Sequence, residues 1–209
     1  DKSVWQKVQR ADRAPLTFWV VARIHELGRI ESAEGAYRLM SYMAGAFYLV
    51  LIPMLADVVG GSRNQRNLVL GIMATGGFMQ LFFGYVENYA LLLPGIVAFL
   101  LSGLLVLRGR FPVAVSSAIL GVLIPLHFFS VAFLPALLVL GLVAGKVQRG
   151  WVVNLCSVLI TPLVSLVCFK LIQFDMWSYL STLGKAHFLS LIAAPDFYQP
   201  YRLLSPYHF

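Results

Sequence analysis

The sequence predicts an all-α protein: a polytopic transmembrane helix bundle with about five membrane helices and an N-terminal interfacial helix. Of its 209 residues, 59% are hydrophobic and only 12% are charged, whereas soluble domains are near 25% charged. A chain this apolar has too few polar residues to cover a surface that faces water. Several apolar runs approach the ~20 residues that a helix needs to cross a bilayer, and short polar loops separate them.

Residues 1–36 are expected to form a non-cytoplasmic loop that contains the interfacial helix. Pro15 suits the first turn of a helix, and residues 16–27 follow it with three ionisable side chains in their second half. This segment is too short and too charged to cross a bilayer core. Its apolar residues and Trp19 favour a helix that lies in the membrane interface. A short helix packed on the bundle is an equally good interpretation.

Residues 37–172 are expected to form the transmembrane bundle. The approximate spans are 37–59, 68–85, 90–107, 113–126, 131–145 and 151–172. The second span contains a Gly76-Gly77 pair, which favours close approach of a neighbouring helix. Residues 173–209 are more polar and aromatic, and we expect them to form a truncated non-cytoplasmic loop.

The fourth and fifth apolar runs, 113–126 and 131–145, are each short for a full span and flank His127. Two interpretations compete for them, a hairpin of two short helices and a single long kinked helix. About thirty apolar residues are too many for one span. We therefore favour the hairpin, with His127 at its turn.

The positive charges predict the orientation of the bundle. Three alternate loops each carry two basic residues and no acidic one, and these residues are Arg63, Arg66, Arg108, Arg110, Lys146 and Arg149. The positive-inside rule places such loops in the cytoplasm, although seven basic residues at or before position 38 lie on the other face and count against it. The net charge of +7 therefore reflects topology, and no Lys/Arg run indicates a nucleic-acid partner.

The turn after the second span holds the first candidate residues. Glu87 is the only acidic residue between Asp57 and Asp175, and Asn88 and Tyr89 follow it. A carboxylate at a membrane edge is costly and usually has a function. Glu87 could bind a divalent cation, orient an acceptor or accept a proton. Alternatively, it only lies at a helix start, where a negative charge is favourable.

His127 and Arg13 complete the candidate set. His127 could be a metal ligand or a phosphate contact, or an interfacial histidine bonded to a carbonyl group. It lies near Glu87 only if the two turns pack together. Arg13 could contact a phosphate, although a lone interfacial arginine is commoner. The candidate substrate- or phosphate-binding residues are Arg13, Glu87, Asn88, Tyr89 and His127, and the candidate ligands of a divalent cation are Glu87 and His127.

Five segments in order carry a resemblance to a known family. They are DRAPLTFW at 12–19, AYRLMSYMAGA at 36–46, the basic loop at 60–67, FGYVENYA at 83–90 and LHFF at 126–129. Their order resembles the membrane half of the polyprenyl-phosphate-sugar-dependent glycosyltransferases of the GT-C class. That class includes the protein mannosyltransferases and the aminoarabinose transferase of lipid A. The resemblance covers most of residues 10–150.

The resemblance implies an enzyme that transfers a sugar from a polyprenyl-phosphate donor to an acceptor on the non-cytoplasmic face of a bacterial inner membrane. It implies an inverting displacement at the anomeric carbon, with the acceptor hydroxyl deprotonated and the departing phosphate neutralised by a cation or an arginine. Glu87 would hold a metal or the acceptor, and His127 and Arg13 would lie near the phosphate. The family's base is an acidic residue just after the first span. Neither Asp1 nor Asp12 matches it, so we assign no catalytic residue and expect the base upstream of residue 1.

A second hypothesis makes the chain a non-catalytic membrane subunit. Fifteen Phe, nine Tyr and four Trp would suit packing against lipids or against the helices of a larger membrane complex. The absence of a matching acidic motif favours this hypothesis. A transporter ranks last, because we find no internal repeat and almost no charge in the central parts of the spans.

Overall fold

The computed structural model describes residues 14–30, 32–84, 88–147 and 150–176, and it confirms the all-α helix bundle. These ranges contain no strand. The chain divides into two compact units, 1–174 and 175–209, and the helices described below belong to the first. Its elements are α2 (Pro15–Leu27), α3 (Ala33–Val59), α4 (Arg63–Thr75), η1 (Gly77–Phe82), α5 (Leu92–Leu107), α6 (Val113–Leu126), η2 (Phe128–Phe133), α7 (Leu134–Val147), α8 (Trp151–Val158) and α9 (Ile160–Leu171).

Among the described residues, three helical segments are long and apolar enough to cross a membrane, which supports a membrane protein. They are Ala33–Val59, Phe128–Lys146 and Trp151–Leu171, and α5 and α6 are shorter apolar helices. The longest, α3, has 27 residues and is therefore ~40 Å long at 1.5 Å per residue. Its first turn is capped by Ser32, whose hydroxyl accepts a hydrogen bond from the backbone N–H of Gly35 at 3.1 Å.

The segment expected to form the second span, 68–85, is not one continuous α-helix in the structure. Helix α4 begins at Arg63, inside the expected basic loop, because Ser62 and Gln65 form a capping box. The helix ends at Thr75, and Gly76 is extended with φ −61° and ψ 143°. The 3-10 helix η1 follows. By length and composition, α4 is not among the segments that could span a membrane in the described part of the chain.

The Gly76-Gly77 pair therefore marks the end of a helix and not a close contact between two helices. A Cβ added to Gly77 would meet no atom within 4 Å. The last four carbonyl groups of a helix lack intrahelical partners, and the buried Tyr48 of α3 donates its hydroxyl proton to one of them, Met73, at 2.8 Å. Phe82 of η1 packs on the same ring, with ring centroids 5.0 Å apart.

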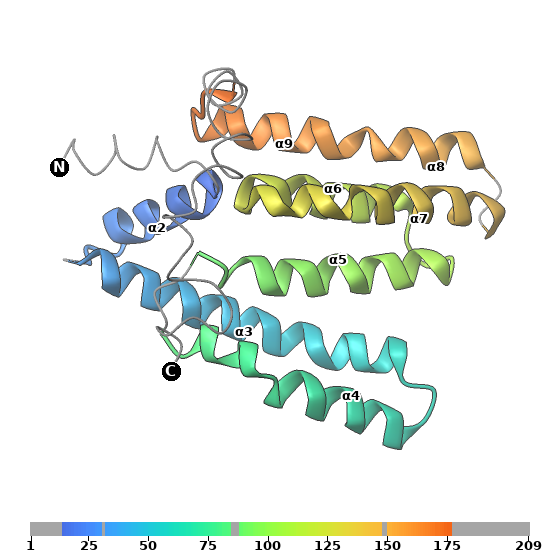
Figure 1. The fold of residues 1–209 in the computed structure, drawn as a ribbon, viewed down its shortest axis with the longest axis horizontal. Coiled ribbons are helices and arrows are strands. Elements are labelled where there is room, and N and C mark those ends of the chain that lie inside the picture. Colours follow the sequence, from blue (N-terminus) through green and yellow to red (C-terminus); the bar gives the residue numbers. More distant parts are fainter. Residues whose placement is uncertain (1–13, 31, 85–87, 148–149, 177–209) are drawn as a thin grey trace, which may run out of the picture. The chain divides into compact units, whose positions relative to one another are not determined.

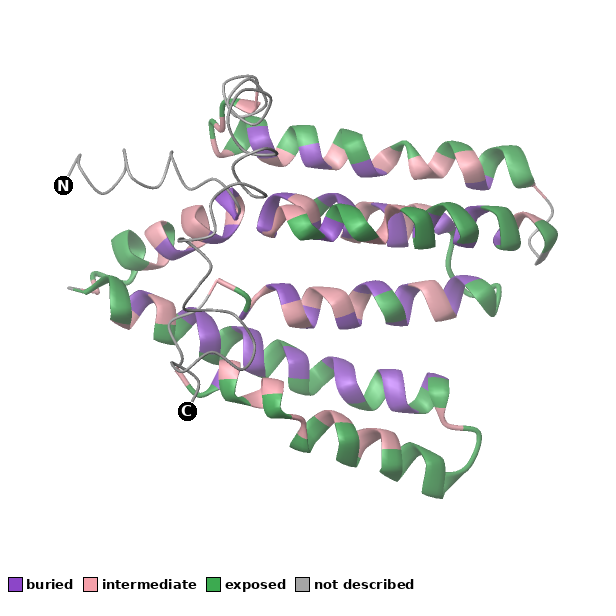
Figure 2. Ribbon diagram, in the orientation of Figure 1, coloured by how far each residue is buried: buried purple, intermediate pink, exposed green. Residues whose placement is uncertain are grey.

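Helix α5 is shared by two hydrophobic clusters. The first joins α2, α3, η1 and α5, with Met40 and Tyr48 fully buried. The second joins α5, α6 and α7, with Leu120 and Leu137 fully buried. Figure 2 shows buried residues along α3, α5 and α6, and largely exposed residues along α4.

Helix α9 packs closely against α6, and small polar residues line the contact. Thr161 and Ser165 of α9 donate hydrogen bonds to the carbonyl oxygens of Ser117 and Gly121 of α6, at 3.0 Å and 2.8 Å. A Cβ on Gly121 would lie 2.7 Å from the Cβ of Val164. Small residues of this kind let membrane helices approach closely. On another side of α6, the Ser116 hydroxyl lies 2.9 Å from that of Ser102 in α5.

The apolar runs 113–126 and 131–145 form two helices joined at His127. This residue is extended, with φ −160° and ψ 121°, so the helical path stops there. The chain then continues through η2 into α7, which runs back alongside α6 (Figure 1). Next come α8 and α9, separated only by Leu159.

Candidate functional site

The structure describes three of the five candidate residues. Asn88 and Tyr89 precede α5, and His127 lies between α6 and η2. Arg13 and Glu87 lie outside the described residues, so the site is built here from the other three and from the side chains that hold them.

Asn88 is attached to α3. The hydroxyl of Tyr37, in the second turn of α3, donates a hydrogen bond to Oδ1 of Asn88 at 3.1 Å. Both side chains are partly buried. A hydrogen bond between residues 51 positions apart fixes the segment before α5 against the start of α3. Tyr37 was not among the candidates, although a tyrosine at the end of a membrane helix is a typical interfacial anchor.

Tyr89 and His127 bring the two turns together. Their ring centroids lie 5.0 Å apart, with the ring planes 36° from each other. The phenol ring of Tyr89 remains 46% exposed, and His127 is partly buried. The pair thus places a phenol ring and an imidazole ring side by side.

The imidazole of His127 has a defined hydrogen-bonding pattern. Its Nδ1 accepts a hydrogen bond from the backbone N–H of Phe129 at 3.2 Å. A nitrogen that accepts uses its lone pair, so the neutral ring carries its proton on Nε2. In this tautomer, Nε2 is a hydrogen-bond donor and has no lone pair to offer a metal ion.

The start of α2 is fixed against the end of α6. The buried Thr17 donates its hydroxyl proton to the carbonyl oxygen of Leu126 at 2.9 Å, one residue before His127. This hydrogen bond satisfies one of the carbonyl groups left open at the C-terminus of α6. Sequence reasoning missed Thr17, because nothing in residues 16–27 tells which face of the helix meets the bundle.

These contacts define what we call the His127 end, which comprises Thr17, Tyr37, Asn88, Tyr89 and His127. Its nearby charges on α2 and α3 form local ion pairs. Arg23 pairs with Glu26 at 2.9 Å, and Arg38 pairs with Glu34 one turn before it. Exposed pairs of this kind add little stability, and each pair neutralises one positive charge.

Among the described residues, no group of three or more His, Cys, Asp and Glu side chains is arranged to hold a metal ion. Of the two candidate ligands, only His127 is described, and its Nδ1 is already engaged. The cation site at Glu87 and His127 therefore stays a prediction, because Glu87 lies outside the described residues.

Three comparisons with known proteins bear on identity. No protein-family model, no curated protein and no solved structure matches this chain. The functional argument therefore rests on the geometry of the His127 end.

Proposed function

We propose that this chain is a multi-pass protein of a bacterial inner membrane that transfers a sugar from a polyprenyl-phosphate donor to an acceptor. In this proposal, the His127 end faces the non-cytoplasmic side and receives the phosphate of the donor. The resemblance to the GT-C glycosyltransferases motivates the proposed reaction. The geometry of the His127 end motivates the proposed position of the phosphate-binding site.

The observation that carries the proposal is the contact between Tyr89 and His127. The two residues come from turns that are 38 positions apart, and both turns were expected to reach the same face. The hydrogen bond from Tyr37 to Asn88 holds one turn, and the hydrogen bond from Thr17 to Leu126 holds the other. A binding site needs such fixed positions, because a loosely held donor gains little from each hydrogen bond.

His127 suits a phosphate oxygen better than a cation. With Nδ1 accepting from Phe129, the neutral ring carries its proton on Nε2, and an N–H group of this kind can donate to an anionic oxygen. Hydrogen bonds to charged groups contribute about 1.5–3 kcal/mol. Tyr89, whose ring lies beside that of His127, carries a hydroxyl group that can also donate.

The reaction follows from the chemistry of the donor. The acceptor oxygen forms a bond to the anomeric carbon while the bond from that carbon to the phosphate oxygen breaks. The proton of the acceptor goes to a base, which we do not assign among these residues, and the electron pair leaves with the polyprenyl phosphate. Negative charge grows on the phosphate in this step, so a donor already placed beside it lowers the barrier. No step of the proposed reaction uses a metal ion.

Binding of the phosphate is the first test. Purified full-length protein in detergent would be titrated with polyprenyl phosphate and with the polyprenol of the same length, and bound lipid would be counted by native mass spectrometry. We expect preference for the phosphate. The His127→Phe variant retains a ring beside Tyr89 but loses the N–H group, so affinity should fall about 10- to 100-fold.

The matched control is Asn67→Ala, which removes the N–H donors of an exposed residue in α4, away from the His127 end. It should bind polyprenyl phosphate as the wild type does. Equal affinity of wild type and His127→Phe would refute the proposed site, and so would equal affinity for the phosphate and the polyprenol.

The second candidate function is that of a non-catalytic subunit. One observation favours it: α8 and α9 expose a row of large apolar side chains, namely Trp151, Val152, Val153, Leu159, Leu163, Leu166, Val167 and Leu171. Such a row could meet a partner helix as well as lipid. Formation of glycosylated acceptor by the purified protein alone would exclude a purely non-catalytic role, and a requirement for a second membrane protein would favour it.

A further inference from the structure

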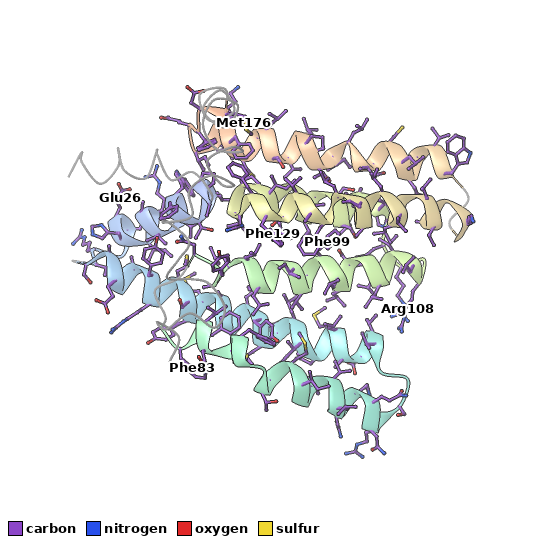
Figure 3. All side chains as sticks on the ribbon, viewed as in Figure 1. Glu26, Phe83, Phe99, Arg108, Phe129 and Met176 are labelled. Carbon is purple, nitrogen blue, oxygen red and sulfur yellow. The ribbon has the colours of Figure 1, made fainter. Side chains whose placement is uncertain are left out.

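The helix ends opposite the His127 end carry a concentration of positive charge. We call this region the basic end and define it by Arg63, Arg66, Arg108, Arg110 and Lys146. In Figure 1, the end of α3, the start of α4, the end of α5 and the end of α7 all lie on the right-hand side of the view. Figure 3 labels Arg108 at this end and Glu26 near the other.

Two of the five cations are engaged by α3. Arg66 forms an ion pair with Asp57 at 2.8 Å, and Arg108 donates a hydrogen bond to the carbonyl oxygen of Val58. Cations are favourable at a helix C-terminus, where the carbonyl groups are unsatisfied. These two contacts therefore bring the start of α4 and the end of α5 to the end of α3.

The other three cations are exposed and make no ion pair within the described part of the chain: Arg63, Arg110 and Lys146. Asp57 is the one acidic residue in the described segments of this end, and it is already paired with Arg66. Like charges at one end of a helix bundle repel each other, and an anion near them lowers this repulsion. The chain itself does not supply that anion in its described residues.

The depth of these cations indicates what the anion is. Lys146 is the last residue of an apolar segment able to cross a membrane, and Arg108 and Arg110 follow directly after the apolar helix α5. Trp151 begins the next apolar segment and is 64% exposed, and tryptophan is enriched at the level of the lipid head groups. Cations that flank a membrane-spanning segment are attracted to the anionic lipid surface.

We propose that the basic end binds anionic phospholipid head groups, through Arg63, Arg110 and Lys146, in the membrane leaflet that surrounds it. Arg66 and Arg108 serve another purpose, since they connect α4 and α5 to α3. This inference does not depend on the proposed glycosyl transfer, because it concerns the opposite end of the helices.

The test compares phosphatidylglycerol with phosphatidylcholine. The full chain would be placed in mixed nanodiscs of the two lipids, extracted gently, and analysed by native mass spectrometry for the lipids that remain bound. Wild type should retain phosphatidylglycerol preferentially. The triple variant Arg63→Gln/Arg110→Gln/Lys146→Gln should lose this preference by about tenfold or more, because each cation near an anionic surface strengthens the attraction.

The matched control removes the same charge from the other end, as Arg23→Gln/Arg29→Gln/Lys170→Gln. All three are exposed, and Lys170 follows Phe169, whose ring lies 5.7 Å from that of Phe128 in η2. This control should keep the preference for phosphatidylglycerol. A wild type without that preference, as expected if the basic end binds an acidic protein instead, would overturn the proposal. Equal losses in both triple variants would also overturn it.

Salt provides a second measurement on the wild type, so the proposal remains testable even if a triple variant does not fold. Exposed charges are screened over about 10 Å at 0.1 M salt and about 3 Å at 1 M. Retention of phosphatidylglycerol should therefore fall when extraction is performed at high salt. Retention that is independent of salt would count against head-group binding by these cations.

Discussion

Gly121 is a position where one added methyl group should disturb the packing of two helices. A Cβ at this residue would lie 2.7 Å from the Cβ of Val164 and 2.8 Å from the carbonyl oxygen of Thr161. The carbonyl belongs to a helix backbone and cannot rotate away, so Gly121→Ala must push α9 from α6. Over-packing of this kind costs about 1–3 kcal/mol, and the lengthened distance also weakens the hydrogen bond from Ser165 to Gly121.

Gly71→Ala is the matched control, because Gly71 lies in α4 and a Cβ there would meet no atom within 4 Å. Alanine is favoured over glycine inside a helix by roughly 0.5–1 kcal/mol, so this variant should be as stable as the wild type or more so. The free energy of unfolding would be measured by titrating mixed micelles with SDS. Equal stability of Gly121→Ala and Gly71→Ala would refute the close contact between α6 and α9.

Three hydroxyl groups give further predictions for the same unfolding assay. Thr17→Val removes the donor to the buried carbonyl of Leu126 and should lower stability by about 1–3 kcal/mol; no loss would mean that α2 is not attached there. Tyr48→Phe keeps the buried ring but removes the hydrogen-bond donor to the carbonyl oxygen of Met73. It should lower the free energy of unfolding by about 1 kcal/mol, and an unchanged value would contradict this hydrogen bond at the end of α4. The buried Ser117 hydroxyl has no hydrogen-bond partner, so Ser117→Ala should leave stability unchanged or raise it by up to ~1 kcal/mol, and a marked loss would contradict that description.

The apolar runs predicted the bounds of a helix well where the length of the run alone determines them. Helix α6 has the expected bounds of 113–126, and α5 begins within two residues of the expected position. The start of α4 was missed although its signal was present, since Ser62 and Gln65 have the spacing of a capping box. The segment was taken as a basic loop because its arginines suit the positive-inside rule. Charge placement and helix formation are different properties, and a residue such as Arg63 can satisfy both.

The candidate site was only partly predictable. The two turns could be assigned to one face, because alternate loops of a membrane bundle share a side. The contact between Tyr89 and His127 depends on how α5 and α6 pack, which the period of apolar residues does not determine. The tautomer of His127 depends on a hydrogen bond from the backbone N–H of Phe129. No sequence pattern predicts this hydrogen bond. Tyr37 was overlooked because an interfacial tyrosine usually serves as an anchor.

The orientation of the helices connects the two proposals, because the donor site requires the His127 end to face away from the cytoplasm. Cysteine labelling measures this directly. Cys156 and Cys168 are free thiols, so both would first be replaced by alanine. Single cysteines would then be introduced as Tyr89→Cys and Arg110→Cys, at positions that are exposed at opposite ends of the helices.

Intact cells would be treated with a membrane-impermeant maleimide, and lysed cells would serve as the reference for full labelling. We predict that Tyr89→Cys is labelled in intact cells and that Arg110→Cys is labelled only after lysis. The reverse pattern would place the His127 end in the cytoplasm and contradict the account.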